Sequence, residues 1–259
     1  MKPSVLLYIF LSTTYTFSQG NIDGFFKSKG QLDLAFSASF SASKRYLLIQ
    51  ESETKISRSQ AIVSTFGIYG LTDNWSVIVS LPLINLELQD ASVFTKYKLA
   101  HCTSKNGELT LVPAVGISFP MSKYDTETPQ AIGQRATVVQ PKLLLQYKHL
   151  KNWFIQAQGG YNYAIDPVPS AFVASTKVGY IYEKWYFDIW ADYQYGIGGE
   201  DYEGALIFRE LGVSYAKLGG VIYRNIGDSS GVFFNGSYIF SGRNIGQAFY
   251  LSTGYVLKL

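Results

Sequence analysis

The chain has 259 residues and a formal charge of +3, with 16% charged and 16% aromatic residues. Lysines and arginines are scattered, so no basic patch suggests nucleic acid as a partner. A single cysteine, Cys102, excludes an internal disulfide framework. After the first twenty residues no 18 uncharged apolar residues occur together, so a chain that enters a bilayer must do so with strands.

The first residues have the layout of a secretory signal peptide. Lys2 precedes the apolar run Val5–Leu11, which is much shorter than the roughly 20 residues of a membrane-spanning helix. Small polar residues follow, and we expect cleavage after Ser18 or Gln19. No cysteine follows the run, so no lipid anchor is expected. The sequence therefore predicts a signal peptide at 1–19 and one domain over 20–259.

The remaining sequence alternates between apolar and polar residues with a period of two. In 153–165, for example, Ile155 belongs to an apolar face and Gln156 to a polar face. One face suits lipid and the other suits a wet interior, as in membrane strands. Leu144 and Trp190 interrupt the pattern in their own segments. The fold class predicted is all-β.

Aromatic residues separate a membrane barrel from a soluble β-sandwich, whose strands could alternate in the same way. Trp75, Trp153, Trp185, Tyr182 and Tyr195 fall near predicted strand ends, where rings suit the two membrane interfaces. A sandwich buries one face of each sheet and has no reason for a second apolar face. We therefore predict a single up-and-down antiparallel transmembrane barrel and keep the sandwich as the alternative.

The pattern predicts twelve strands, an even number as in single-chain bacterial barrels. Parity decided the interpretation of 205–225, which we treat as one long strand with a bulge at Gly219 and Gly220 instead of two strands. The predicted ranges are 30–41, 60–71, 75–84, 91–100, 108–119, 135–148, 152–165, 172–182, 185–195, 205–225, 231–240 and 247–258.

Connection lengths predict which end of the barrel faces which side. Tight turns are expected in the periplasm and longer loops outside the cell. The turns are 72–74, 149–151 and 183–184, and the loops are 42–59, 120–134 and 196–204. The loop 120–134 is polar and long enough to fold inward as a constriction or outward as a binding surface.

One hairpin carries a family resemblance. Tyr69-Gly70-Leu71-Thr72-Asp73-Asn74-Trp75, followed by Val79-Ser80-Leu81-Pro82, resembles the hairpin of the MetA-pathway phenol-degradation outer-membrane family, and Asp90 followed by Lys96-Tyr97-Lys98 is similar to its next strand. Elsewhere only the layout matches, and the first hairpin together with the loop after Phe119-Pro120 also resembles related Bacteroidota barrels. The resemblance implies a transport role, without a cargo or catalytic residues.

Alternation assigns one set of polar side chains to the lumen. Mixed charges and amides could line a solute path and tune its selectivity. Alternatively, the charges could satisfy one another inside a small barrel and leave a filled shell without a continuous path. The set is Lys96, Lys98, Gln140, Lys142, Gln156, Gln158, Asn162, Lys177, Asp188, Asp192, Gln194, Glu210, Arg224 and Asn235.

Catalysis and metal binding find little support in the sequence. Enzymatic barrels use a Ser or Asp with a His, but His101 and His149 fall in predicted periplasmic turns without a nucleophile motif. No His or Cys set has ligand spacing. A Ca²⁺ site among the loop carboxylates 200–203 remains the alternative to ordinary solvation. We expect no enzyme activity, no metal site and no cofactor.

The last strand adds a separate signal. Ser252, Gly254, Leu257 and Leu259 resemble the terminal β-signal read by the barrel-assembly machinery, although the usual final residue is aromatic. An ordinary edge strand would be the alternative.

Together these features predict a barrel in the outer membrane of a Gram-negative bacterium. We expect it to contact outer-membrane lipid and to pass a small, apolar or aromatic solute by passive diffusion. The alternative is a structural or partner-binding barrel without a continuous pore. Oligomeric state is left open, because lipid demands the same apolar exterior that a subunit interface would.

Overall fold

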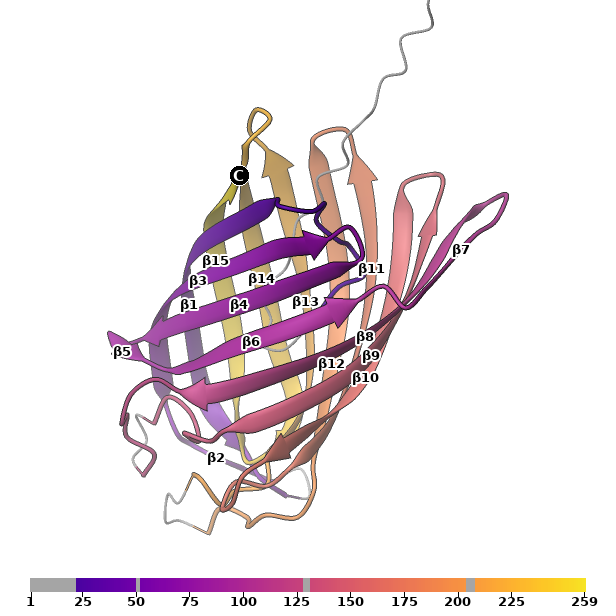
Figure 1. Ribbon diagram of the computed structural model, residues 1–259. Coiled ribbons are helices and arrows are strands. Elements are labelled where there is room, and N and C mark those ends of the chain that lie inside the picture. Colours follow the sequence, from indigo (N-terminus) through magenta and orange to yellow (C-terminus); the bar gives the residue numbers. More distant parts are fainter. Residues whose placement is uncertain (1–21, 50–51, 128–130, 204–207) are drawn as a thin grey trace, which may run out of the picture.

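The computed structural model describes residues 22–49, 52–127, 131–203 and 208–259. Within these residues twelve long strands form a closed antiparallel barrel, in which each strand pairs with the next and β15 returns to β1 (Figure 1). Register across the closing seam is continuous from Asp33 opposite Lys258 to Ser43 opposite Ala248. The predicted all-β barrel and its strand number are confirmed.

The long strands run in chain order around the wall. They are β1 (Leu32–Leu47), β3 (Arg58–Thr72), β4 (Trp75–Ile84), β6 (Asp90–Tyr97), β8 (Gly107–Pro120), β9 (Val138–His149), β10 (Trp153–Ala164), β11 (Ala171–Tyr182), β12 (Trp185–Gly196), β13 (Ser214–Asn225), β14 (Ser230–Arg243) and β15 (Ile245–Lys258). Three short strands add to the rims, namely β2 (Glu53–Thr54), β5 (Glu87–Leu88) and β7 (Ala100–Thr103).

The outward positions carry large apolar side chains. In β10, Trp153 and Ile155 are exposed while Phe154 and Gln156 are buried, and the same alternation continues around the barrel. A water-soluble monomer rarely exposes a contiguous apolar surface larger than a few hundred Å². Trp75, Trp153 and Trp185 each begin a strand, so they mark one rim with aromatic rings as membrane interfaces require. The exterior is that of a membrane-spanning barrel.

The two ends of the barrel differ in their connections. At the short-turn end, which is uppermost in Figure 1, Thr72 pairs with Trp75 and Tyr182 with Trp185, leaving two residues in each turn. In the second of these turns Glu183 has a positive φ of 52°, which is common in two-residue hairpin turns. At the long-loop end, β8 joins β9 through 121–137 and β12 joins β13 through 197–213. The predicted distribution of turns and loops agrees with this arrangement.

Strand β13 departs from the prediction. It begins at Ser214, because residues 208–213 belong to the loop and 204–207 lie outside the described residues. Register is continuous through Gly219 and Gly220, and the irregularity lies between Ala216 and Lys217 instead. The predicted bulge was therefore wrong in its position. Gly219 has a packing role, since a Cβ there would overlap the Trp190 ring on the adjacent strand.

Strand limits elsewhere shift by a few residues. β1 continues to Leu47, so part of the predicted loop 42–59 is strand, and β9 begins at Val138 instead of residue 135. β7 forms a small hairpin with the start of β8 and extends beyond the rim at the short-turn end (Figure 1). Cys102 lies on β7 as an exposed free thiol.

Candidate functional site

A segment before β1 occupies the lumen at the short-turn end. We call residues 22–31 the plug segment. Ile22 and Phe25 are 4% and 7% exposed, and the Phe25 ring meets Phe154 edge to face with centroids 5.0 Å apart. They belong to an apolar cluster to which each of the twelve barrel strands contributes. Since apolar burial drives packing, this half of the lumen is a packed core around the segment.

Charge pairs fasten the plug segment to the wall. The Lys96 ammonium is fully buried and donates to the Asp23 carboxylate at 2.7 Å, to the Asp23 carbonyl at 2.9 Å and to the Phe25 carbonyl at 2.5 Å. Lys27 forms a second buried ion pair, with Asp33. A buried charge is tolerated when its partners satisfy it, as they do here.

Close backbone packing also locates the plug segment. Gly70 of β3 lies directly against it, and a Cβ at this position would overlap the carbonyl of Ser28. The amide of Gly30 donates to the Gly70 carbonyl at 2.8 Å, and Gly70 donates back to Gln31 at 3.0 Å. The segment therefore continues the hydrogen bonding of the wall as it enters the lumen.

The described residues of the loop 121–137, namely 121–127 and 131–137, fold inward at the opposite end. Tyr124, Ala131 and Ile132 are 2%, 3% and 9% exposed, and Gln89 donates to the Ile132 carbonyl at 2.7 Å. The Tyr124 hydroxyl donates to Asp90 at 2.6 Å, and burial raises the pKa of Tyr124, which keeps this donor protonated. Of the two predicted orientations of this loop, the structure shows the inward one.

Contacts across the lumen hold this loop in place. Gln134 donates to the carbonyls of Phe208 and Leu211 at 2.8 and 3.1 Å, and Arg58 donates to Ala131. Arg209 donates back to the Gln134 carbonyl at 3.3 Å. Because these partners come from the loop before β13 and from β3, residues 131–135 reach across the lumen. We call the described residues of this loop, 121–127 and 131–137, the lid.

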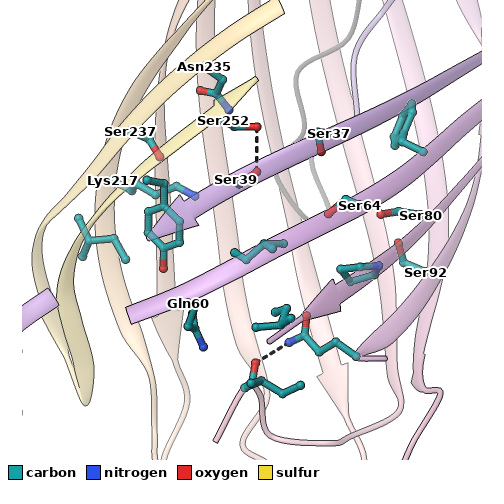
Figure 2. Close-up of a pocket in the computed structure, with 18 of the residues that line it drawn as sticks. Ser37, Ser39, Gln60, Ser64, Ser80, Ser92, Lys217, Asn235, Ser237 and Ser252 are labelled. Atoms are coloured by element: carbon teal, nitrogen blue, oxygen red, sulfur yellow. Dashed lines mark hydrogen bonds between the residues drawn. The ribbon is translucent and has the colours of Figure 1, made fainter. Parts of the chain in front are cut away.

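A cavity of about 320 Å³ lies between the plug segment and the lid. Ile22 lines it at the end nearer the plug segment, and Ile132 and Gln89 line it at the end nearer the lid. Its walls come mainly from β1, β3, β4, β6, β13, β14 and β15, and Figure 2 shows serines from several of these strands side by side. Seven serines line it, namely Ser37, Ser39, Ser64, Ser80, Ser92, Ser237 and Ser252.

The opposite wall, from β9 to β12, carries four of the eight charged residues that alternation assigned to the lumen. Lys177 lies 3.4 Å from Asp188, which also accepts a hydrogen bond from the Tyr186 hydroxyl at 2.6 Å. Lys142 lies with its ammonium 5.1 Å from the Phe94 ring centroid. The contact between Lys177 and Asp188 agrees with the filled-shell alternative, in which charged side chains pair with one another. The barrel nevertheless contains a cavity between the plug segment and the lid.

Most residues of the predicted lumen set are buried on the inner face. This holds for Lys96, Gln140, Lys142, Gln156, Lys177, Asp188, Asp192 and Asn235, while Gln158, Asn162 and Gln194 are partly buried on inward positions and Lys98 lies half-buried beyond the end of β6, 5.0 Å from the Phe26 ring centroid.

Two residues of the set lie elsewhere. Arg224 is exposed on the outside of β13, with its guanidinium 4.9 Å from the centroid of the Trp185 ring. Glu210 lies in the loop before β13, opposite Glu200, because the predicted strand began too early. Both predictions fail for the same reason, since alternation gives the correct face only within a strand of correct extent and register.

The sequence reasoning missed the plug segment, the serine lining and the inward Leu144 and Trp190. Serines at positions 37, 39, 41 and 43 alternate with the apolar residues Phe36, Ala38, Phe40 and Ala42, which is a period-two signal for a small polar inner face. Leu144 and Trp190 do not break the alternation. They occupy inward positions, where Leu144 packs in the apolar cluster and Trp190 lines the cavity. Nothing in 22–31 marks a lumenal segment.

Metal and catalytic chemistry are not evident in the described part of the chain. Within it, no group of three or more His, Cys, Asp or Glu side chains could hold a metal ion. His101 hydrogen-bonds to Thr110 at 3.1 Å, and His149 accepts from the Lys151 amide at 3.0 Å. Neither contact is the base and nucleophile arrangement of hydrolytic enzymes.

No protein family matches the sequence, and no curated protein is detectably similar to it. Solved structures share its fold. The COG4313 outer membrane channel from Pseudomonas putida F1 has a TM-score of 0.67 at 14% identity, over 92% of this chain and 100% of that one. The NanC porin has 0.61 at 12% identity, over 87% and 100%, and the KdgM porin has 0.56 at 4% identity, over 86% and 98%. The chain thus has the fold of outer-membrane channels and porins.

Proposed function

We propose that this protein is an outer-membrane channel that passes a small solute by passive diffusion and rests in a closed state. The observation that carries the proposal is the cavity between the plug segment and the lid inside a membrane-spanning barrel. A shell with only structural duties would have no use for a solute-sized space lined by hydroxyls. Its place is the outer membrane, with the short-turn end facing the periplasm and the long-loop end facing outward.

Passage of a solute through the barrel requires both the plug segment and the lid to move. The plug segment is a short stretch that enters the lumen before the first strand, so it can leave without breaking the strand pairing of the wall. The lid is joined to β8 and β9 at its two ends, and between these ends side-chain hydrogen bonds attach it to the wall and to the loop before β13. We propose the plug segment as the main gate and the lid as a second one.

Membership in the MetA-pathway phenol-degradation family is part of the proposal. The motif Tyr69 to Pro82 supports it, and this motif folds as the β3–β4 hairpin at the short-turn end. The signal peptide at 1–19, recognition of the C-terminal strand by the barrel-assembly machinery and the absence of enzyme activity belong to the same proposal.

A reversible cross-link tests the gate. The Cβ position of Gly24 lies 2.7 Å from the Cβ of Gln146, so a shift of about 1 Å brings Cys residues at both positions to disulfide distance. In a Cys102→Ser background, we expect Gly24→Cys with Gln146→Cys to block single-channel conductance when oxidised and to restore it on reduction.

The matched control joins two wall strands on the lipid side. Ala157 and Thr176 face each other on β10 and β11 and are both exposed, so the pair Ala157→Cys with Thr176→Cys should conduct equally in both redox states. Equal conductance of Gly24→Cys with Gln146→Cys in the oxidised and reduced states would show that the plug segment does not gate the conduction path. Folded protein that never conducts would favour the structural or partner-binding barrel, for which the buried ion pairs of the lumen are the main support.

A further inference from the structure

We propose that the cavity is a binding site for an uncharged, polyhydroxylated solute of about monosaccharide size. This inference rests on the proposed channel function, because the cavity lies on the path between the two gates. It names the class of solute that the walls would recognise.

Hydroxyl groups dominate the polar lining. A serine hydroxyl both donates and accepts hydrogen bonds, and it does so without a charge. The register places the serines in neighbouring pairs, with Ser37 opposite Ser64 and Ser80 opposite Ser92. Their arrangement on adjacent strands is seen in Figure 2. A solute that carries several hydroxyls can exchange donors and acceptors with such a row, whereas a hydrocarbon cannot.

The same wall holds a donor and an acceptor whose hydrogen bonds are unmet among the described residues. Trp190 is 5% exposed and its indole Nε1 has no acceptor, and Asn235 is 8% exposed and its Oδ1 has no donor. Both residues line the cavity. Buried polar groups normally have hydrogen-bond partners. These two atoms therefore suggest a polar solute that, after a small adjustment of the wall, provides the missing acceptor and donor.

The charge of the lining argues for a neutral guest. Among the described residues that line the cavity, Lys217 is the one with a formal charge. Its ammonium lies 3.9 Å from the Asp192 carboxylate and 5.0 Å from the centroid of the Trp190 ring. An anionic solute needs an excess of free cations, and here the cation already has a carboxylate and an aromatic face as partners.

Size and apolar surface fit the same class. The volume of about 320 Å³ is at the lower end of small-molecule sites. Ile62, Phe66 and Ile132 give the cavity apolar surface beside its hydroxyls. A sugar ring has both kinds of surface, since its C–H face is apolar and its rim is polar. The mixed lining therefore matches a sugar-like ring better than a purely apolar or a charged molecule.

Equilibrium binding to the folded full-length mature chain tests the inference. The detergent should be an amine oxide, because glucoside detergents carry the headgroup of the probe. The probes are glucose, glucuronate and phenol, and the readout is the change in tryptophan fluorescence that is absent in Trp190→Phe. Trp75, Trp153 and Trp185 lie on the outside and serve as an internal reference. Each titration is run on the wild type and on Lys96→Met, in which we expect the plug segment to leave the lumen.

We expect saturable binding of glucose, with weaker binding of glucuronate and phenol. Ser64→Ala with Ser80→Ala should weaken glucose binding at least about tenfold, because two hydrogen-bonding groups are lost. Ser175→Ala is the matched control, since Ser175 is buried on β11 and does not line the cavity. It should bind glucose like the wild type.

Other results would overturn the inference. Glucose without a saturable effect on either protein, or phenol binding that ignores the serine substitutions, contradicts the solute class. Conductance of the same preparations separates the two proposals: a conducting protein without glucose binding keeps the channel and loses this inference. A protein that binds glucose and never conducts keeps the site and loses the channel.

Discussion

In the plugged half of the lumen, inward side chains from the twelve strands meet the plug segment and one another, whereas in the cavity half similar inward positions face open space. In the first half the Lys96 ammonium donates to three oxygens of the plug segment, while in the second half Trp190, Asn235 and seven serines line a cavity. The comparison teaches that one alternating pattern can build either a packed core or a polar chamber. The side chains at these positions decide which one forms.

Size and charge of the inward residues explain the difference. The plugged half uses Phe154, Leu144 and Ile181, which fill the lumen around Phe25. The cavity half uses serines, which are too small to reach across. A barrel of twelve strands is too wide for serines alone to close. Where small residues gather, space remains, and where large ones gather, a short segment completes the packing.

The largest effect is expected from Lys96→Met, which breaks the plugged half. Removing the ammonium leaves the Asp23 carboxylate buried without its partner, which costs about 3 to 5 kcal/mol in comparable buried pairs. We expect the plug segment to leave the lumen and channel openings to become frequent, while a heat-modifiability gel still shows a folded barrel. Single-channel recording measures the opening frequency.

Lys98→Met is the matched control for this prediction. Lys98 is two residues away, is only half-buried and contacts the plug segment through the Phe26 ring. It should change the opening frequency far less. If both variants conduct like the wild type, the ion pair does not hold the gate.

A smaller effect is expected from Gln89→Leu, which tests whether the hydrogen bond at the lid end of the cavity holds the lid closed. The substitution leaves the buried Ile132 carbonyl without its 2.7 Å donor, at a cost of about 1 to 3 kcal/mol. The lid should open more often, with longer open times, while the plug segment stays docked. Protection of the Ile132 region in hydrogen exchange should fall. Unchanged protection of this region would show that Gln89 does not hold the lid.

The smallest effect is expected at the rim of the long-loop end. The hydrogen bond from Arg243 holds the pKa of Asp201 below its usual value of 3.8. A lowered pKa in the folded state means that the pair stabilises the loop above that usual value and loses this contribution as the pH falls through the lowered pKa. Because both side chains are partly exposed, the contribution is about 1 kcal/mol or less.

Hydrogen exchange at pH 6 and pH 3, corrected for intrinsic rates, measures this contribution. The amides of Glu200 and Gly212, which hold the loop by backbone hydrogen bonds, should lose some protection at the lower pH. Arg243→Met should remove most of this difference. Arg45→Met, at an exposed pair with Glu53 on the same rim, is the control and should leave it unchanged. If Arg243→Met keeps the whole difference in protection between pH 6 and pH 3, the pH response belongs to another group.

A structural feature could be predicted from the sequence when residues close to one another in the chain determine it. Alternation located the strand 75–84 to the residue and placed Gln156 and Asp188 on the inner face, because side-chain direction follows from the strand itself. It failed for Arg224 and Glu210, where the extent of β13 depended on how the preceding loop folds. Strand limits depend on partner strands as well as on local propensity.

By itself, the sequence determined the all-β class, the apolar exterior and the identity of most inward polar residues, while the count of twelve strands also needed the even-number rule for bacterial barrels. These properties follow from a period of two and from turn residues, which act over a few positions. Only the tertiary structure decided that residues 22–31 fill one half of the lumen, that the lid covers the other end and that Trp190 faces a cavity. Those features join residues far apart in the chain, such as Asp23 with Lys96, and no local pattern records such a contact.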